Sequence, residues 1–118
     1  MKIMTAAELW AMPAGTIYAR CVLCITHGWC VKGDNMGDAD SPCWSQCPII
    51  EFKHDSSNEF ADNFFAMWDD GASFPIQLDF YGREDTWDKD VRYIVLEYED
   101  QFELMRNLVE MTKLREMS

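Results

Sequence analysis

Residues 91–96 have the sequence Val91-Arg92-Tyr93-Ile94-Val95-Leu96. The last four residues of this stretch are apolar and uninterrupted, which predicts a central β-strand covered on both faces. A helical pattern over about residues 100–115 comes next and places Leu104, Leu108 and Met111 on one stripe. Acidic residues stand at the start of this helix and basic residues at its end, the order that the helix dipole favours.

Four more strands are predicted upstream of this one. They cover residues 16–23, 29–32, 44–52 and 76–81. The first and the last of the four alternate apolar and polar residues, which is typical of a strand with one buried face. Pro48 interrupts the third, so we expect that strand to be bulged or to lie at a sheet edge. Residues 34–42 are rich in Gly, Asp and Asn and are predicted to form a loop.

Two capping boxes mark the starts of two helices. The first, Thr5-Ala6-Ala7-Glu8, begins a short helix that must end before Pro13. The second, Ser56-Ser57-Asn58-Glu59, begins a helix that Gly71 is placed to end. With the last helix, the element order is α-β-β-β-α-β-β-α. This order predicts a single α+β domain over residues 1–118, with a mainly antiparallel five-stranded sheet and three helices.

The composition restricts the classes of partner. The 118-residue chain holds 21 acidic and 10 basic residues, a net charge of −11, and 48% of its residues are hydrophobic, enough to form a core. The charge argues against bare duplex nucleic acid and anionic membrane surfaces, because both attract basic proteins. The five cysteines are an odd number, and the first residues lack the apolar segment of an export signal. We therefore expect free thiols in a reducing cytoplasm.

The anionic charge is concentrated in the middle of the chain. Residues 1–32 have a net charge of +2, residues 33–103 of −14 and residues 104–118 of +1. Asp69 and Asp70 stand at the predicted end of the second helix, where acidic side chains oppose the helix dipole and cost up to about 1 kcal/mol each. Since stability favours basic residues there, the two acids indicate a role in binding. A solvated surface that serves solubility is the alternative interpretation.

Eight carboxylates and two tryptophans are the candidate contact residues. Carboxylates arrayed on a helix and its neighbouring loops imitate duplex DNA, which carries one charge per about 1.7 Å of axis. Such a surface attracts proteins that bind nucleic acid through a basic groove. The candidate contact carboxylates are Glu59, Asp62, Asp69, Asp70, Glu84, Asp85, Asp88 and Asp90, and the candidate apolar anchors are Trp68 and Trp87.

Cysteine and histidine are grouped in one stretch, which raises a second hypothesis, a small zinc-stabilised domain with a structural or regulatory role. The possible zinc ligands are Cys21, Cys24, His27 and Cys30, with Cys43, Cys47 and His54 further along. Their spacing differs from that of established zinc fingers, in which two close pairs lie about a dozen or more residues apart. Small buried thiols are the alternative, and we expect no metal and no other cofactor.

An enzyme with carboxylate acid–base chemistry is the third hypothesis. The sequence shows no nucleophile elbow, no catalytic cysteine signature and no Gly-rich phosphate loop. With 21 acids in the chain, two acids that lie close together in the sequence carry little information. We therefore expect a non-enzymatic protein and assign no catalytic residue.

Four short stretches point to one group of proteins. They are Glu8-Leu9-Trp10-Ala11-Met12-Pro13-Ala14-Gly15-Thr16-Ile17-Tyr18, Cys30-Val31-Lys32-Gly33-Asp34, Pro75-Ile76-Gln77-Leu78-Asp79 and Glu97-Tyr98-Glu99. Together they resemble small phage and prophage proteins of unassigned function, which implies a phage origin. By analogy with small acidic phage proteins that inhibit host defence, such as anti-CRISPR and anti-restriction proteins, the resemblance implies an inhibitor. The expected partner is a host protein with a basic nucleic-acid-binding surface, in the cytoplasm of the host bacterium.

Overall fold

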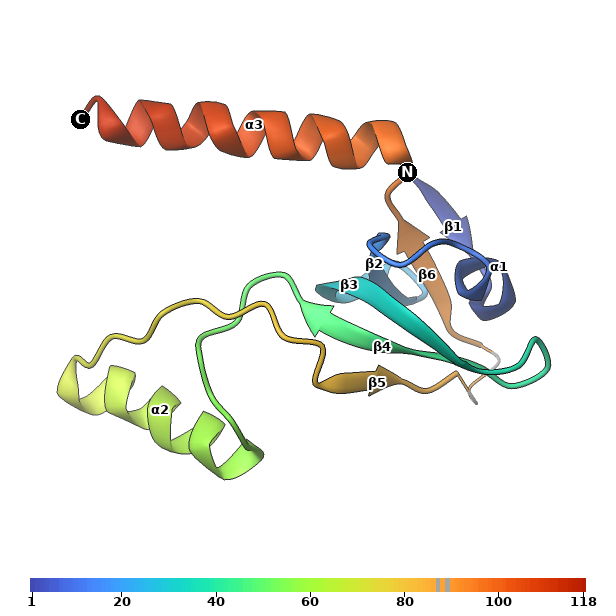
Figure 1. The fold of residues 1–118 in the computed structure, drawn as a ribbon, viewed down its shortest axis with the longest axis horizontal. Helices are drawn as coiled ribbons and strands as arrows, with labels where there is room; N and C mark the ends of the chain where they lie inside the picture. The colour runs from blue at the N-terminus through green and yellow to red at the C-terminus, as the bar shows by residue number, and fades with distance from the viewer. Residues whose placement is uncertain (87, 89) are drawn as a thin grey trace.

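The computed structural model describes residues 1–86, 88 and 90–118. Its strands form one sheet with the order β1-β6-β2-β3-β4-β5, in which every neighbouring pair is antiparallel (Figure 1). The strands are β1 (Lys2–Met4), β2 (Ile17–Val22), β3 (Ile25–Gly37), β4 (Pro42–Pro48), β5 (Gly82–Glu84) and β6 (Arg92–Val95). The helices are α1 (Ala6–Trp10), α2 (Ser57–Asp70) and α3 (Tyr98–Glu116). The α+β class is confirmed, and β6 lies between β1 and β2, as its apolar sequence predicted.

The described residues form six strands where the sequence predicted five, because β1 precedes the first helix, and the bounds of other strands also differ from the prediction. β1 and β5 were not predicted, because a three-residue strand is too short to show a period. Residues 76–81 were predicted as a strand, but in the structure Ile76 pairs with Phe52 in an isolated bridge and the rest runs outside the sheet. Residues 34–37 were predicted as loop and instead continue β3 beyond a shift in its pairing with β4.

The core is built around three aromatic rings from three strands. Tyr18 of β2, Trp44 of β4 and Tyr93 of β6 meet edge to face, with ring centroids 5.6–5.8 Å apart. Leu9 of α1 is fully buried beside them. The capping box of Thr5 fixes the start of α1, as predicted, because both of its reciprocal hydrogen bonds are present. The strongest packing is therefore at the α1 end of the sheet.

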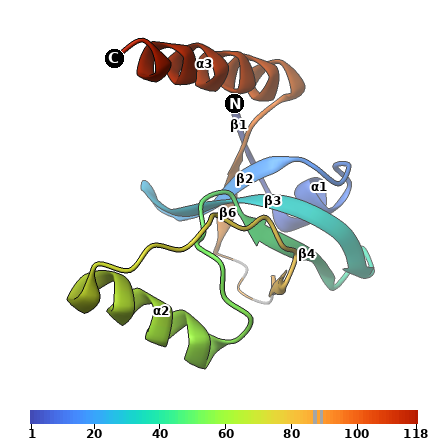
Figure 2. The ribbon, with the colours of Figure 1, turned by 60° about the vertical axis from the view of Figure 1, so that its left-hand side comes forward.

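Helix α2 stands at the end of two chain segments, residues 51–54 and 74–77, which we call the stem. The backbone amide of Lys53 donates to the carbonyl of Pro75 at 2.7 Å, and that of Gln77 donates to Glu51 at 2.9 Å. The two segments therefore run antiparallel to each other from the sheet to the helix. Figures 1 and 2 both show α2 held away from the sheet by this stem.

The start and end of α2 follow the sequence signals. The Ser56 hydroxyl accepts from the amide of Glu59 at 3.1 Å, and Gly71 ends the helix in a left-handed conformation with φ of 69°. Side-chain contacts fix the helix to the stem. The side-chain amide of Asn63 donates to the Lys53 carbonyl at 2.9 Å, and the ring of Phe60 stacks on Phe52 with centroids 4.8 Å apart.

Helix α3 is fixed to the sheet near its first turn. The side-chain oxygen of Gln101 accepts from the amide of Ile17 at 2.8 Å, and its nitrogen donates to the carbonyl of Gly15 at 3.0 Å. Beyond that point the helix is exposed, and it lies above the level of the sheet in Figures 1 and 2, whereas α2 lies below it. In the part of the chain that the structure describes, both helices make few contacts with other elements.

These two projecting helices make the molecule open. Its radius of gyration is 16.3 Å, whereas a compact domain of this length has about 13.5 Å. Its accessible surface is 8416 Å², whereas a folded monomer of this mass exposes about 6,600 Å². No helix among the described residues combines the length and the apolar character that crossing a membrane requires.

Candidate interaction surfaces

The acidic residues of α2 share one side of the helix. At about 100° per residue, Glu59, Asp62, Asp69 and Asp70 all fall within an arc of about 100°. Asp62, Asp69 and Asp70 are exposed and Glu59 is half-buried. We call these four residues the acidic arc. The last turn of α2 holds no basic residue, so its acids face the negative end of the helix dipole without local compensation.

Aromatic residues of α2 lie next to the acidic arc. The same geometry places Phe60, Phe64, Phe65 and Trp68 on a neighbouring arc of about 140°, which we call the aromatic arc. Phe65 is 58% exposed and Trp68 is 77% exposed, the values of side chains that touch little of their own chain. The rings of Phe64 and Trp68 stack with centroids 6.3 Å apart. Trp68 is therefore accessible to a partner, and its role as an apolar anchor stays a prediction.

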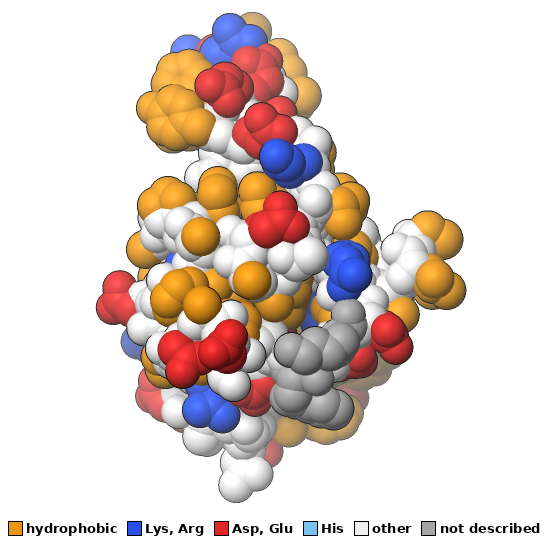
Figure 3. Space-filling model, turned by 90° about the vertical axis from the view of Figure 1, so that its right-hand side faces the viewer, with side chains coloured by type: hydrophobic (Ala, Val, Ile, Leu, Met, Phe, Trp, Pro, Cys, Tyr) orange, Lys and Arg blue, Asp and Glu red, His pale blue; other side chains and the backbone are white. Residues whose placement is uncertain are grey.

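The other predicted carboxylates lie elsewhere. Asp85, Asp88 and Asp90 are exposed, but Asp85 directly follows β5, whose end lies far from α2 along the long axis of the molecule in Figure 1. Asp85 pairs with Arg83 at 3.1 Å, and Asp88 accepts a hydrogen bond from the backbone of Asp90. Trp87 lies outside the described residues. On the face that Figure 3 shows, acidic side chains are scattered among hydrophobic ones, so the acids do not form one continuous patch there.

Glu84 was predicted as a surface contact, and this is wrong. Its side chain is buried, with the residue 7% exposed. Oε1 accepts a hydrogen bond from the Tyr18 hydroxyl at 3.0 Å, and Oε2 lies 3.8 Å from the guanidinium of Arg20. Burial raises the pKa of the Glu84 carboxyl, and the Tyr18 hydrogen bond and Arg20 oppose that rise. A carboxylate held this way belongs to the core and does not reach a partner.

Glu84 also lines a cavity of about 360 Å³, which bears on the enzyme hypothesis. Arg20, His27, Cys30 and Gln46 are among its other lining residues. Burial, together with the charge of Glu84, raises the pKa of the Cys30 thiol to about 11, so this thiol is a poor nucleophile at neutral pH. Among the described residues, Glu84 is the one acid that lines this cavity. The pair of convergent acids that the enzyme hypothesis needs is therefore not formed there.

The structure does not bring the predicted zinc ligands together. The described residues contain no group of three or more His, Cys, Asp or Glu side chains placed to hold a metal ion. Cys21 is buried, and its thiol donates to the carbonyl of Arg92 at 3.3 Å, whereas Cys24 and His27 are exposed on the β2–β3 hairpin. Side chains that alternate along a strand point to opposite faces, so ligands at every third position diverge.

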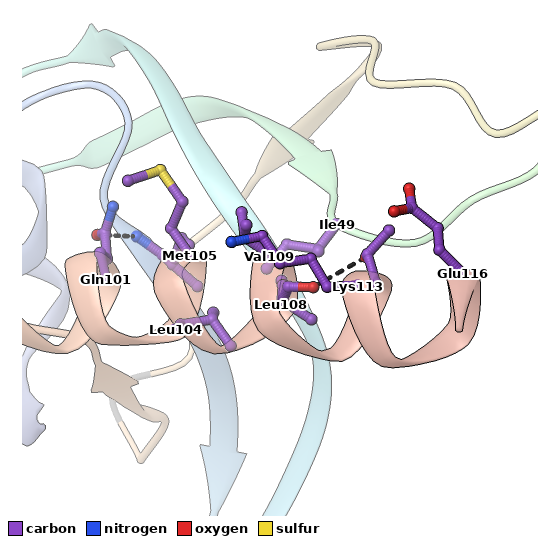
Figure 4. Close-up of a pocket in the computed structure, with 10 residues that line it drawn as sticks. Ile49, Gln101, Leu104, Met105, Leu108, Val109, Lys113 and Glu116 are labelled. Atoms are coloured by element: carbon purple, nitrogen blue, oxygen red, sulfur yellow. Dashed lines mark hydrogen bonds between the residues drawn. The ribbon is translucent and has the colours of Figure 1, made fainter. Parts of the chain in front are cut away.

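A groove beside α3 is a surface that the sequence did not reveal. It has a volume of about 930 Å³, with Leu104 and Leu108 on the helix side and Trp29, Ile49 and Ile50 among the residues on the sheet side. A second hollow of about 560 Å³ continues it along the helix, and Figure 4 shows apolar side chains of α3 and Ile49 around this hollow. The stripe of leucines was visible in the sequence, but the sequence did not show that the stripe is left open.

The α3 groove, the acidic arc and the aromatic arc are thus the surfaces on which a function can be built. Comparisons of this chain with protein-family models, with curated proteins and with solved structures returned no match.

Proposed function

We propose that the protein is a non-enzymatic interaction protein whose acidic surface binds a protein that has a basic nucleic-acid-binding surface. In its specific form, the proposal is a phage-encoded inhibitor of a host defence protein, of the anti-CRISPR or DNA-mimic type, that acts in the host cytoplasm. The observation that carries it is the arrangement of α2, where four acids share one arc beside exposed aromatic side chains.

The density of charge on α2 supports this choice of partner. Glu59 and Asp70 are eleven positions apart, which corresponds to about 16 Å along a helix axis. Four carboxylates over this length approach the charge density of one DNA strand, in which successive phosphates lie about 3.4 Å apart along the axis. A partner built to bind phosphates therefore meets a comparable field on α2.

The aromatic arc offers large apolar side chains, which can supply binding energy in addition to the attraction between charges. Interfaces draw most of their binding energy from a few large side chains, often Trp or Tyr, that are surrounded by a polar rim. Trp68 and Phe65 are exposed large side chains of this kind, and the acids beside them form a polar rim. The stem holds this surface away from the sheet, which leaves room for a partner to approach α2 from several sides.

Two charge-reversed variants test the proposal with a matched change in charge. Asp69→Lys with Asp70→Lys changes the acidic arc, and Asp88→Lys with Asp90→Lys makes the same change far from α2. Immobilised wild-type protein is incubated with bacterial lysate, and captured protein is then challenged with duplex DNA and with increasing salt. We expect the D69K/D70K variant to lose capture and the D88K/D90K variant to keep it.

Competition by DNA is the decisive part of the experiment. A partner that uses its nucleic-acid site must be released by added duplex, because both ligands need the same basic surface. Captured protein that stays bound in the presence of excess duplex contradicts the proposal, as does equal capture by the two variants. If the acids serve solubility alone, D69K/D70K lowers solubility and leaves capture unchanged.

A further inference from the structure

Helix α3 faces the sheet across a groove, and apolar side chains line the groove on both the helix side and the sheet side. Leu104, Met105, Leu108, Val109 and Met111 are between 36% and 62% exposed, although they form the apolar side of the helix. Ile17 and Ile49 line the hollows on the sheet side. Figure 4 shows Leu104, Met105, Leu108, Val109 and Ile49 around an open space, with Gln101 hydrogen-bonded at one end of it.

We infer that this groove is the interface with a second copy of the chain, and that the protein is a dimer in which α3 of each copy packs against the α3 groove of the other. Leu104, Met105, Leu108, Val109 and Met111 span an arc of about 160°, whereas a helix that lies on one surface needs about 100°. The extra width suits a helix with two neighbours, its own sheet and a second copy.

The area of exposed surface fits a permanent dimer. The chain exposes about 1,800 Å² more than a folded monomer of its mass. Permanent homodimers bury about 1,000–2,500 Å² per subunit, with interfaces more apolar than those of transient complexes. Both projecting helices contribute to this excess, and burying α3 and its groove against a second copy would remove the part that α3 contributes.

A second copy of the chain is also the partner that is always available to fill the α3 groove. Apolar surface of this extent promotes aggregation if it stays open, so its occupant must be present whenever the chain is folded. A second copy always meets this condition, because it is made at the same place and in the same amount. A host protein meets it only after encounter, which suits the acidic arc better than the α3 groove.

Charge along α3 is complementary to the groove. Glu51, Asp100 and Glu103 lie at the groove. The N-terminal ammonium of Met1 pairs with Asp100 and Arg106 pairs with Glu103, so the rim keeps a small net negative charge. Residues 104–118, which include the second half of α3, have a net charge of +1 in a chain of net charge −11. A twofold axis uses the same patch twice, so it can place the positive end of each α3 beside the acidic rim of the other copy.

The mass of the full chain in solution tests this inference first. Sedimentation equilibrium at several protein concentrations is expected to give twice the 13.8 kDa of the chain. Leu108→Glu places a charge in the groove and is expected to raise the dimer dissociation constant about a hundredfold or more. Ile49→Glu, on the opposite wall, is expected to have the same effect.

Met117→Glu is the matched control, because it also places a glutamate at an exposed apolar position, at the end of the same helix. Met117 is 82% exposed and lies about 180° around the helix axis from Leu108, outside the apolar arc. The M117E variant is expected to remain a dimer. Circular dichroism that matches the wild type shows that L108E is folded.

If L108E does not fold, amide hydrogen exchange of the wild-type protein tests the inference instead. On dilution to the monomer, amides of α3 are expected to lose protection, and amides of β2 and β6 to keep it. A wild-type protein that is monomeric at every concentration overturns the inference, as does one with three or more copies. Equal effects of L108E and M117E also overturn it. Because these variants leave α2 unchanged, their outcome is independent of the lysate experiment.

Discussion

The hydroxyl of Tyr18 donates a 3.0 Å hydrogen bond to Glu84 and thereby ties the centre of the sheet to its edge strand β5. The same hydroxyl accepts a 3.0 Å hydrogen bond from the indole nitrogen of Trp44. All three side chains are buried, so the chain Trp44–Tyr18–Glu84 is a polar network inside an aromatic core. Networks of this kind stabilise a fold only while every member keeps its partner.

Removing the central member of this network is expected to destabilise the protein. Tyr18→Phe leaves the Trp44 indole N–H and the Glu84 carboxylate without the shared hydroxyl, which costs about 1–3 kcal/mol of unfolding free energy. Urea unfolding followed by circular dichroism measures the change. Tyr98→Phe is the matched control, because Tyr98 is 78% exposed and its loss is expected to change stability by less than about 0.5 kcal/mol. Equal stability of Y18F and Y98F would contradict this account.

The buried carboxyl of Glu84 is expected to make stability depend on pH. Its pKa is raised in the folded state, so the folded protein binds a proton that the unfolded chain has already released. The stabilisation is complete below about pH 4.3, the ordinary pKa of glutamate, and is lost as the pH rises through the raised pKa.

Glu84→Gln keeps the shape of the side chain and removes this titration. We expect the unfolding free energy of the wild type, relative to E84Q, to fall as the pH rises above about 4.3, the ordinary pKa of glutamate. Urea unfolding of both proteins at several pH values measures the difference. A difference that is flat above this pH, or that grows with pH, would show that burial does not raise the pKa of Glu84.

Gly33 is expected to tolerate no side chain. It lies where the β3–β4 pairing shifts, and a Cβ atom there would stand 2.1 Å from the Ser45 hydroxyl and 2.8 Å from the Phe80 ring. Gly33→Ala is therefore expected to cost about 1–3 kcal/mol of stability.

Gly28 offers the control in the same strand, because a Cβ atom there would meet nothing within 4 Å. Gly28→Ala is expected to be neutral or to stabilise by up to about 1 kcal/mol, since alanine restricts the unfolded chain. Thermal unfolding of the two variants measures the contrast. If G28A destabilises as much as G33A, crowding at Ser45 and Phe80 is not the cause.

Trp68 is expected to matter for binding and not for folding. At 77% exposure its replacement by alanine should change the unfolding free energy by less than about 0.5 kcal/mol. If it anchors the partner, Trp68→Ala weakens the complex at least about thirtyfold, which corresponds to about 2 kcal/mol. Titration calorimetry with the captured partner measures this. Leu23→Ala, at the 92% exposed tip of the β2–β3 hairpin, is the control and should leave affinity unchanged.

Local signals predicted the local structure well. The capping box at Thr5, the serine at Ser56 and the glycine at Gly71 mark real helix ends, because each acts through hydrogen bonds or backbone angles within a few residues. The apolar run at 93–96 marked a strand that does lie inside the sheet.

Properties set by distant residues were not predictable in the same way. Glu84 stands in an acidic run and has the sequence context of a surface residue, but Tyr18, 66 positions earlier, determines its place in the core. Ile76 and Leu78 alternate like residues of a half-buried strand and are nevertheless 63% and 65% exposed. A period of two shows which residues share a face, and it does not show whether anything covers that face.

The acidic arc is an intermediate case. The four acids of α2 share one side because of helical geometry alone, so the sequence was sufficient once the helix was known. Asp85, Asp88 and Asp90 belong to another part of the molecule because the chain returns through the stem to β5 before reaching them. The net charge of residues 33–103 therefore overstated the negative charge that any one surface of the molecule carries.

The path of the chain through the stem has a consequence for how the protein can change. Gln46 of β4 pairs with Gly82 of β5, so residues 49–81 leave the sheet and come back to nearly the same point. Residues 49–81 therefore have the geometry of an insertion into the loop of the β4–β5 hairpin. A short turn in its place would leave the sheet register intact, and the helix with its stem could be grafted between two antiparallel strands of another scaffold. Recombination can therefore exchange α2 for a different helix while the sheet stays as it is.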